Sequence, residues 1–585
     1  MEVNPGADGP RAVEEVRGMN IVTKAWLVQH LVRWRLTWAK RDTRYRYPAN
    51  GNSKFMSARD AVALIRDGDV IATSGIAGNQ RAAILYWAIR EVYEETGHPA
   101  RLTLLCTGGQ GGRGKVPGSM EELGVQGLCT RHIAGHQETF KAILRLAAKG
   151  QCEIQCLPQG VVAFLIEAQG RGEDSIVTPT GVGTFLDPRV GPGSHIFDPN
   201  AEQLISVEGD MLRYRAPKIT VAMFGAPSAD REGNVYLRNA SIIGESFDVV
   251  RAARRNGGRV IVNVGRVVGK PEGDLVIPSR DVDAIVVDPR CEQAVSIKHR
   301  KYWPMLTTHS DMPIDEAIER LRFVNAFLKI TPVRSEIDNV LARLAAMVFA
   351  ENVKKGSYVN IGVGLPEEAC RMLHEAGLLK EVTVFTESGV IGGLPAPGVF
   401  FGASACPQRM VSSPEIFRII ATKLDVTMLG VVEADSEGNV NVSRRGDDPA
   451  NYVGPGGFID ITTGAKTIIF VTAWMTRSDI AIAGDKIQIR QHGPCKFIEK
   501  VPEITFSGRQ ALKHGKKVFY VTTVGVFRLT ERGMELVRVM PGVDIQRDIM
   551  SVSRMRIVLP ESGEVPVVDA SVVSGQGFTL SYKEA

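Results

Sequence analysis

The sequence is poor in cysteine and in aromatic residues, and both shortages exclude whole classes of protein. It has 8 cysteines in 585 residues, which is too few for a disulfide scaffold. Cys152 and Cys156 lie close together, but no second pair completes a zinc site, so we expect reduced thiols and no metal. Aromatic residues make up only 6%, which does not suit a protein that stacks nucleic-acid bases.

Long apolar runs and a secretory leader are also missing from the sequence. No stretch approaches the roughly 18 consecutive apolar residues that a membrane-spanning helix needs. The beginning of the chain is acidic and polar, whereas a secretory leader is basic and then apolar. We therefore expect a cytoplasmic protein without stable membrane insertion.

Positive charge is concentrated in one short segment. The net charge is +5, and residues 21–47 hold seven Lys and Arg residues against a single Asp. The main body is therefore nearly neutral, which argues against a nucleic-acid partner. Residues 21–39 carry Trp and Leu at helical spacing, which predicts a basic amphipathic helix. A helix of this kind can lie on a membrane surface, but we favour packing on its own body or in a homo-oligomer.

The length predicts more than one domain, because single cores stop growing near ~250–300 residues. From residue 53, helices alternate with short apolar strands, which favours an α/β fold with mainly parallel sheets covered by helices. The same order of elements begins again near residue 335, and residues 229–235 are echoed by residues 434–440. We interpret this as an ancient duplication of one domain. The predicted parts are an N-terminal extension over 1–52 with a disordered tip over 1–18, a first domain over 53–301, a linker over 302–334 and a second domain over 335–585.

Three patterns that often carry chemistry are weak in this chain. Residues 109–114 fit G-x-G-x-x-G, but no long helix follows to meet a pyrophosphate, so we interpret them as a mobile glycine loop. His132 and His136 have the spacing of zinc ligands on a helix, yet Gly135 lies between them, so we expect a loop or capping role. The phosphate-binding pattern G-x-x-x-x-G-K-[ST] does not occur.

The most informative segment is an apolar strand that ends in a carboxylate. Residues 382–386 form this strand, Glu387 follows, and small residues clear space around it. Ligands bind at the carboxyl ends of strands in parallel sheets, where a Glu can act as a base or a nucleophile. From spacing alone, a solvated carboxylate on an exposed turn is an equal alternative.

Two glycine turns in the second half have free space around their backbone. Residues 453–460 read Val-Gly-Pro-Gly-Gly-Phe-Ile-Asp, and residues 362–367 read Gly-Val-Gly-Leu-Pro-Glu. Backbone N–H groups in such turns can hold an anion. Each turn can equally be structural and simply begin the element that follows it.

Five motifs together resemble the family I coenzyme A transferases, and the likeness runs from residue 53 to the C-terminus. The fused two-copy layout is similar to that of the single-chain acetate/propionate and 3-oxoacid CoA-transferases. The motifs are residues 157–160 (Leu-Pro-Gln-Gly), 178–184 (Thr-Pro-Thr-Gly-Val-Gly-Thr), 360–366 (Asn-Ile-Gly-Val-Gly-Leu-Pro), 386–389 (Thr-Glu-Ser-Gly) and 454–458 (Gly-Pro-Gly-Gly-Phe).

The resemblance implies that CoA moves from a short-chain acyl-CoA to a carboxylic acid, with CoA as a co-substrate and no permanently bound cofactor. Glu387 would be the nucleophile and would carry CoA as a thioester in a ping-pong reaction. The Gly457 N–H and the Gln159 amide would stabilise the oxyanion. The glycines of the two turns would help to hold CoA, namely Gly362, Gly364, Gly456 and Gly457.

Two parts of the sequence depart from the family pattern. The first fifty residues have no place in it, and residues 421–422 read Ala-Thr where a glycine pair is expected. The identity of the acyl group therefore stays open. So do two alternative functions, an acyl-CoA hydrolase and a non-catalytic protein that binds CoA or a dinucleotide.

Overall fold

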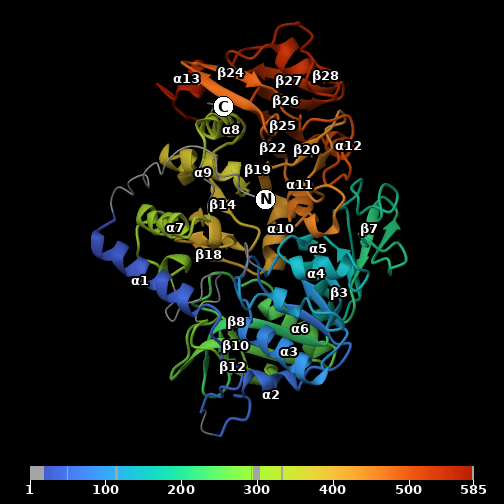
Figure 1. The fold of residues 1–585 in the computed structure, drawn as a ribbon, viewed down its shortest axis with the longest axis vertical. Coiled ribbons are helices and arrows are strands. Elements are labelled where there is room, and N and C mark those ends of the chain that lie inside the picture. The colour runs from blue at the N-terminus through green and yellow to red at the C-terminus, as the bar shows by residue number, and fades with distance from the viewer. Residues whose placement is uncertain are drawn as a thin grey trace.

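The protein is described here by a computed structural model, which covers residues 19–48, 51–111, 116–291, 293, 303–330 and 334–582. The predicted tip over residues 1–18 lies outside these ranges. In Figure 1 the elements of the first half, coloured blue to green, lie at one end of the molecule, and those of the second half, coloured yellow to red, extend to the other. Two large, mainly parallel sheets with helices packed on them confirm the predicted α/β fold.

The first sheet has nine strands in the order β11-β9-β8-β1-β2-β3-β4, and β10 and β12 extend it from β8. All of its pairs are parallel except β8–β9 and β9–β11. Its strands are β1 (Val70–Thr73), β2 (Leu102–Cys106), β3 (Cys129–Ala134), β4 (Glu153–Cys156), β8 (Val221–Asp230), β9 (Val235–Tyr236), β10 (Arg259–Val268), β11 (Val276–Ile277) and β12 (Ala284–Val287). The helices of this half are α2 (Ala58–Val62), α3 (Ala83–Thr96), α4 (Lys141–Ala147), α5 (Gln159–Arg171) and α6 (Ser246–Arg255).

The second sheet has ten strands in the order β18-β15-β14-β13-β19-β22-β25-β26-β27-β28, with a parallel centre from β14 to β25. Its strands are β13 (Tyr358–Ile361), β14 (Thr383–Phe385), β15 (Val390–Ile391), β18 (Arg409–Met410), β19 (Leu424–Gly430), β22 (Thr467–Val471), β25 (Lys517–Thr522), β26 (Gly525–Thr530), β27 (Gly533–Val539) and β28 (Ile557–Val558). The helices that accompany it are α8 (Glu336–Asn352), α9 (Leu365–Glu375), α10 (Ser413–Lys423), α11 (Phe458–Gly464), α12 (Gly508–Lys513) and α13 (Ala570–Ser574).

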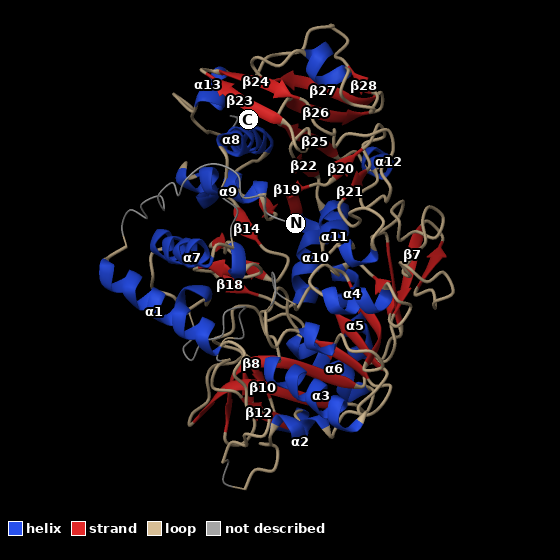
Figure 2. Cartoon of the chain, viewed as in Figure 1, coloured by secondary structure: helices blue, strands red, loops and turns tan. Residues whose placement is uncertain are grey.

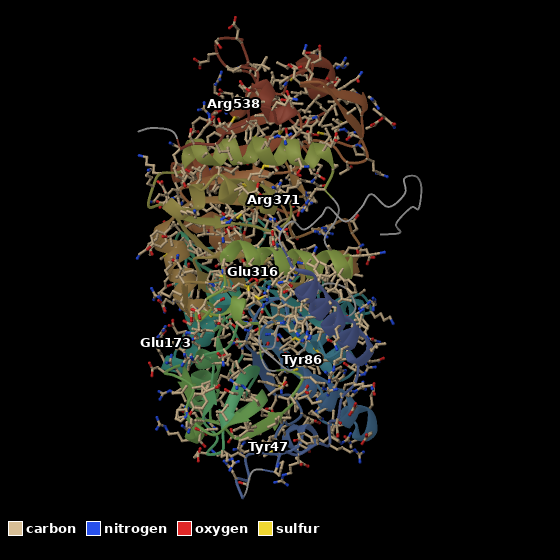
Figure 3. All side chains as sticks on the ribbon, turned by 90° about the vertical axis from the view of Figure 1, so that its left-hand side faces the viewer. Tyr47, Tyr86, Glu173, Glu316, Arg371 and Arg538 are labelled. Carbon is tan, nitrogen blue, oxygen red and sulfur yellow. The ribbon has the colours of Figure 1, made fainter. Side chains whose placement is uncertain are left out.

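Helices cover both faces of this second sheet, as the alternation of side chains along β22 shows. Ile469 and Val471 belong to the core beneath α8, whereas Ile468 and Phe470 belong to the core on the opposite face. Successive side chains of a strand point to opposite faces, so an unbroken apolar run is what a strand buried on both sides requires. On the α8 side, Arg538 of β27 pairs with Glu351 of that helix (Nη2–Oε2 2.9 Å), near the upper end of Figure 3.

Smaller elements project from the two large sheets. A three-stranded sheet of the first half has the order β5-β7-β6, and three hairpins accompany the second half. These strands are β5 (Ser175–Thr178), β6 (Ile205–Glu208), β7 (Met211–Arg215), β16 (Leu394–Pro395), β17 (Ser404–Ala405), β20 (Glu433–Ala434), β21 (Val440–Asn441), β23 (Asp479–Ala483) and β24 (Lys486–Gln491). Helix α7 (Ile314–Leu328) lies in the segment between the halves.

The two halves meet along helix α5, which contacts α6 of its own half and α10 and α11 of the other (Figure 2). Tyr452 and Ile459, from the second half, are buried in the core of the first. The Gln137 N–H also donates to the Val453 carbonyl at 2.7 Å. The seam is therefore a packed interface with hydrogen bonds across it.

Helix α1 (Ile21–Thr37) forms where the sequence predicts a basic amphipathic helix. Asn20 caps it by accepting the Thr23 N–H at 2.8 Å, and one face is buried through Leu27, Leu31 and Trp34. This face packs beside α7 and Trp303, and α1 and α7 lie side by side in Figure 1. The helix thus packs on the body of its own chain, as the sequence suggested.

The structure corrects the assignment of His132 to a loop. His132 lies within β3 and is fully buried; its Nδ1 lies 2.8 Å from Gln137 Oε1, and its ring packs edge-on against Phe140. Burial lowers the pKa of His132 to about 4, so the ring is neutral. His136 does lie in a loop beyond the strand. Glycine at position 135 obscured the strand because it follows the strand's last residue.

Candidate active site

A cavity of about 670 Å³ opens at the seam and contains all of the predicted site residues. The C-terminal ends of β13, β14, β19 and β22 form its floor. This is the edge at which parallel sheets bind ligands. The first half contributes Gln159 and the second contributes Glu387, and Gly362, Gly364, Gly456 and Gly457 line the same space.

A tight turn after β14 presents Glu387 to the cavity. The Gly389 N–H returns to the Thr386 carbonyl at 3.2 Å, and the Thr386 and Ser388 hydroxyls lie 2.7 Å apart. Gly389 has φ +92°, and a Cβ there would lie 2.2 Å from the Val411 carbonyl oxygen. Only glycine permits this close approach, so the sequence Thr-Glu-Ser-Gly fixes the direction of the Glu387 side chain.

The Glu387 carboxylate is half-buried and lies among uncharged groups. Within the described residues it makes no hydrogen bond or ion pair. Burial alone raises the pKa of Glu387 to about 7. A carboxylate without hydrogen-bond donors keeps its lone pairs available, which suits a nucleophile.

Gly457 faces this carboxylate from the start of α11. A Cβ at Gly457 would lie 2.2 Å from Glu387 Oε2, so any larger residue would collide with the carboxylate. The Gly457 N–H has no hydrogen-bond partner in the part of the chain that the structure describes. A free donor therefore lies beside the carboxylate.

Gln159 reaches the same place from the first residue of α5. Its N–H donates to the Gly456 carbonyl at 3.0 Å, and the Gly456 N–H donates to the Gly135 carbonyl at 2.8 Å. These bonds hold the Gly-Pro-Gly-Gly turn of one half against a helix end of the other. The Gln159 side chain is 3% exposed, and its amide makes no hydrogen bond to any described residue.

In the turn at residues 362–364, unlike at Gly457, the glycine N–H groups are hydrogen-bonded to other parts of the protein. The Gly362 N–H donates to the Met428 carbonyl at 2.8 Å, and the Gly364 N–H to Glu367 Oε2 at 3.2 Å. Both glycine donors are thus used within the protein. What this turn offers a ligand is space, since a Cβ at Gly364 would meet nothing within 4 Å.

Asp460 is a second buried carboxyl group near Glu387. It ends the glycine turn at residues 453–460, and the sequence alone did not indicate a role for it. It lies in the first turn of α11 and accepts the Gly160 N–H at 2.9 Å. Burial raises the pKa of Asp460 to about 8, and the nearby charge of Glu387 adds to this increase. Its position one helical turn after Gly457 was the sequence signal that could have placed it near the site.

Three further groups lining the cavity were missed by sequence reasoning. Lys496 donates to the Val431 carbonyl at 3.2 Å and to the Thr472 hydroxyl, and burial lowers its pKa to about 8. Arg445 pairs with Glu138 of the first half (Nη1–Oε1 2.7 Å). The third group is the C-terminal end of α1. No local motif marks Lys496 or Arg445, because only the fold brings them to the cavity.

The glycine loop touches the cavity through its first residue. Gly109 lines the wall and its carbonyl accepts the Ala77 N–H at 2.6 Å, while residues 112–115 lie outside the described ranges. Among the described residues, no group of three or more His, Cys, Asp and Glu side chains could hold a metal. Nor does any described helix have the length and apolar character needed to cross a membrane.

Comparisons with known proteins agree on one family. Residues 55–288 match the coenzyme A transferase family. Caffeate CoA-transferase of Acetobacterium woodii is 32% identical over 512 residues, covering 85% of this chain and 93% of that protein. Acetate CoA-transferase YdiF of Escherichia coli (strain K12) is 30% identical over 547 residues, covering 91% and 97%.

Solved structures extend this similarity to three dimensions. The YdiF acyl-CoA transferase apoenzyme from Escherichia coli O157:H7 superposes with a TM-score of 0.79 and 28% identity, covering 92% of this chain and 100% of that chain. The structure of the same enzyme as a thioester complex with CoA gives a TM-score of 0.78 over the same shares.

Proposed function

The chain belongs to the coenzyme A transferases, and from this premise we propose that Glu387 carries CoA as a thioester between a short-chain acyl-CoA and a carboxylic acid. The protein is an enzyme that transfers CoA, and the acyl-CoA is its substrate. The observation that carries the proposal is a half-buried Glu387 carboxylate that shares one cavity with the Gly457 N–H and the Gln159 amide, none of which has a hydrogen-bond partner among the described residues.

In the first step, a Glu387 carboxylate oxygen attacks the thioester carbonyl carbon. The C–S bond breaks, CoA leaves as a thiolate, and an acyl–glutamyl anhydride forms. The thiolate then attacks the glutamyl carbonyl carbon, which releases the first acid as a carboxylate and leaves CoA on Glu387. An incoming carboxylate reverses these steps, so the thioester bond energy is conserved without ATP.

Each attack places a negative charge on a carbonyl oxygen. The Gly457 N–H and the Gln159 amide are the proposed donors to it, because both residues line the same cavity as Glu387 and neither donor is occupied within the described residues. Preorganised donors of this kind stabilise a transition state at no cost of reorganisation. The space at Gly362, Gly364 and Gly456 is proposed to hold the CoA chain near the carboxylate.

The raised pKa of Glu387 fits this role. A carboxylate removed from water is more reactive than a solvated one, and at neutral pH a substantial fraction of Glu387 is still ionised. Acetate and caffeate are the acids in the names of the two relatives. We therefore propose a monocarboxylic acid as the acceptor.

We also propose that the enzyme works in the cytoplasm as a homo-oligomer. Its eight cysteines are all free, which suits a reducing compartment. Ile21, Val22 and Leu36 leave an exposed apolar strip on α1, which supports contact with a second copy. Light scattering during size-exclusion chromatography measures the mass of the protein in solution. A monomer at all concentrations would contradict the proposed homo-oligomer.

The thioester is tested by intact-protein mass spectrometry after incubation with acetyl-CoA and no acceptor acid. Wild type should gain the mass of CoA, the adduct should map to Glu387, and hydroxylamine should remove it. Glu387→Gln should gain nothing and should lose transfer activity. Glu499→Gln changes an exposed residue outside the cavity lining and should behave as wild type.

Two outcomes would overturn the proposal. One is a Glu387→Gln enzyme that still transfers CoA and still forms the adduct. The other is CoA release from acetyl-CoA that is as fast without an acid as with one, which would make the enzyme a hydrolase.

A further inference from the structure

The C-terminal end of α1 lines the cavity, although this helix lies outside the motifs that carry the family resemblance. Trp34, Arg35 and Trp38 contribute to the wall. The two Trp rings meet edge to face, with centroids 5.8 Å apart, and the Arg35 guanidinium lies 4.4 Å from the centre of the Trp38 ring. Three large side chains thus form a defined surface at this point.

Helix α1 is fixed to α7 and, through the chain that follows it, to α3, so its C-terminal end has a defined place at the cavity wall. Its buried face packs beside α7 and Trp303. The chain that follows it is tied to α3, because Glu91 binds Arg41 (Nε–Oε1 2.7 Å) and accepts the Thr43 hydroxyl at 2.6 Å.

The lining residues of the cavity lie on both sides of Glu387 when they are placed along the strand order of the second sheet. In one direction, β13, β19 and β22 follow β14 and lead to Thr472 and Lys496. In the other direction lie β15 and the loop at Phe401 and Gly402. This loop is held to the turn that carries Glu387 by the hydrogen bond from the Ser388 hydroxyl to the Gly402 carbonyl.

The first direction offers positive charge, because Lys496 and Arg445 both line it. Lys496 donates hydrogen bonds to Val431 and Thr472. Arg445 forms an ion pair with Glu138. The phosphates of CoA carry the strongest negative charge of either substrate, so this is the direction that suits the CoA chain.

The second direction is apolar. Its walls include Ile76, Ala77, Val399 and Phe401 in addition to the two Trp residues of α1. A Cβ at Gly402 would lie 3.0 Å from Ile76, which shows how closely the first half meets this loop. Among the described residues, polar side chains of the cavity wall here include Arg35 on α1 and, beside Gly109, His136 and Thr139.

We propose that Trp34 and Trp38 close an acyl pocket, and that this pocket selects an uncharged, apolar acyl group larger than acetyl. This inference rests on Glu387 being the site of transfer, as proposed above. An acyl chain that leaves Glu387 in the apolar direction is removed from water and contacts Ile76, Phe401 and the Trp rings. A second carboxylate on the acyl group would lose its water beside the apolar side chains of Ile76, Val399 and Phe401, at a cost in free energy that apolar contacts do not offset.

The test compares kcat/KM for acetyl-, butyryl-, hexanoyl- and succinyl-CoA with propionate as the acceptor. Wild type should favour hexanoyl- over acetyl-CoA by about tenfold or more, because each buried methylene is worth roughly fourfold in binding. The value of kcat/KM should be lower for succinyl-CoA than for butyryl-CoA. Trp38→Ala should lower the value for hexanoyl-CoA at least several-fold while changing that for acetyl-CoA little, and Trp38→Phe should retain most of the preference.

The matched control is Trp26→Ala, which removes a Trp from the same helix at a site 49% exposed and outside the cavity wall. It should leave the order of substrates unchanged. The wild-type ranking by itself tests the pocket, so the inference does not depend on the stability of Trp38→Ala.

Two results would overturn the inference. The first is a wild-type rate that is independent of chain length or highest for succinyl-CoA. The second is an equal loss for all four donors in Trp38→Ala, which would mean that Trp38 contacts CoA and not the acyl group. Absence of the CoA adduct on Glu387 with every donor would instead count against the proposed mechanism, and the acyl preference would still be readable from turnover.

Discussion

The Gly160 N–H donates to Asp460 Oδ2 at 2.9 Å, across 300 positions of sequence and across the seam between the halves. A Cβ at Gly160 would lie 2.6 Å from Asp460 Oδ1 and 2.5 Å from the Phe417 ring, so the helix end and the carboxyl approach as closely as the backbone allows. Gln159 directly precedes Gly160. We therefore expect Asp460 to act as a positioning residue, which holds the backbone beside Gln159 and so sets the position of the Gln159 amide relative to Glu387.

Substitutions of Asp460 by Asn and by Ala should show whether its hydrogen bond or its ionisable carboxyl group matters for activity and stability. Because the pKa of Asp460 is raised to about 8, the group is mostly protonated at pH 7, and Asn reproduces both its size and its acceptor oxygen. Asp460→Asn should keep kcat within about threefold, a change of less than 1 kcal/mol. Asp460→Ala leaves the Gly160 N–H buried without its partner and should cost about 1–3 kcal/mol of unfolding free energy.

Steady-state kinetics and urea unfolding measure both Asp460 effects. A positioning role predicts that Asp460→Ala lowers kcat more than it raises KM, because the misplaced amide matters most in the transition state. Equal behaviour of the Asn and Ala variants in both measurements would contradict it.

Gly457→Ala should nearly abolish transfer while the fold persists. The added Cβ would lie 2.2 Å from Glu387 Oε2 and would push the carboxylate out of line with the donors. A loss of about 100-fold in kcat is expected, similar to removal of one oxyanion donor. Gly269→Ala is the control, because a Cβ at that exposed glycine meets nothing within 4 Å. Retention of half or more of the activity in Gly457→Ala would be inconsistent with the described geometry.

Gln159→Ala should slow the reaction without weakening CoA binding. Loss of its amide removes one of the two proposed donors, and such a loss typically costs about 2.7–4 kcal/mol in the transition state, or 100- to 1,000-fold in kcat. Stopped-flow measurement of adduct formation on Glu387 isolates this step from substrate binding. Gln126→Ala, at an exposed position outside the cavity wall, should match wild type. A Gln159→Ala enzyme that changes only KM would show that the amide binds substrate and does not stabilise the oxyanion.

Glu387→Gln should stabilise the fold above neutral pH. Burial raises the pKa of Glu387 from 4.5 to about 7, so the folded state holds this proton more tightly than the unfolded state does. The folded protein therefore loses stability as the pH rises from about 4.5 to about 7, and the loss is complete above that. Gln carries no charge and removes this loss, for a gain on the order of 1–3 kcal/mol at pH 8.

Thermal unfolding of wild type and Glu387→Gln at pH 5 and pH 8 measures this gain. The difference in Tm between the two proteins should be larger at pH 8 than at pH 5. Glu499→Gln should show no such dependence, because Glu499 is exposed in both states. A gain that shrinks as the pH rises would mean that the folded protein favours the ionised carboxylate.

The α/β fold could be predicted because the strands carry their own signal. Leu102–Cys106 and Val70–Thr73 are short apolar runs between helical stretches, and the structure places them as adjacent parallel strands. Glu387 could be singled out for a related reason, since a carboxylate directly after such a run lies at the edge where ligands bind. The domain boundaries and the roles of Gln159 and Gly457 stay predictions that the experiments above address.

The remaining parts of the site depend on contacts between distant residues. Lys496 follows no motif and enters the cavity only because β22 and the segment after β24 meet there. His132 was assigned to a loop because Gly135 lies between it and His136, whereas the strand that contains His132 ends directly before that glycine. Trp38 was recognised as part of an amphipathic helix, but its periodicity does not show which surface covers it.

The hydrogen bonds that join Gln159 to Gly456 and Gln137 to Val453 connect the two halves, so the cavity needs residues from both of them. Proteolytic cleavage in the segment that contains α7 would produce two fragments, each with an intact sheet and neither with a complete catalytic centre. The packed seam would still bind the two fragments to each other, but without the covalent tether their association would depend on concentration. A cleaved sample would therefore lose turnover on dilution and recover it on concentration, whereas uncut enzyme would be indifferent to either.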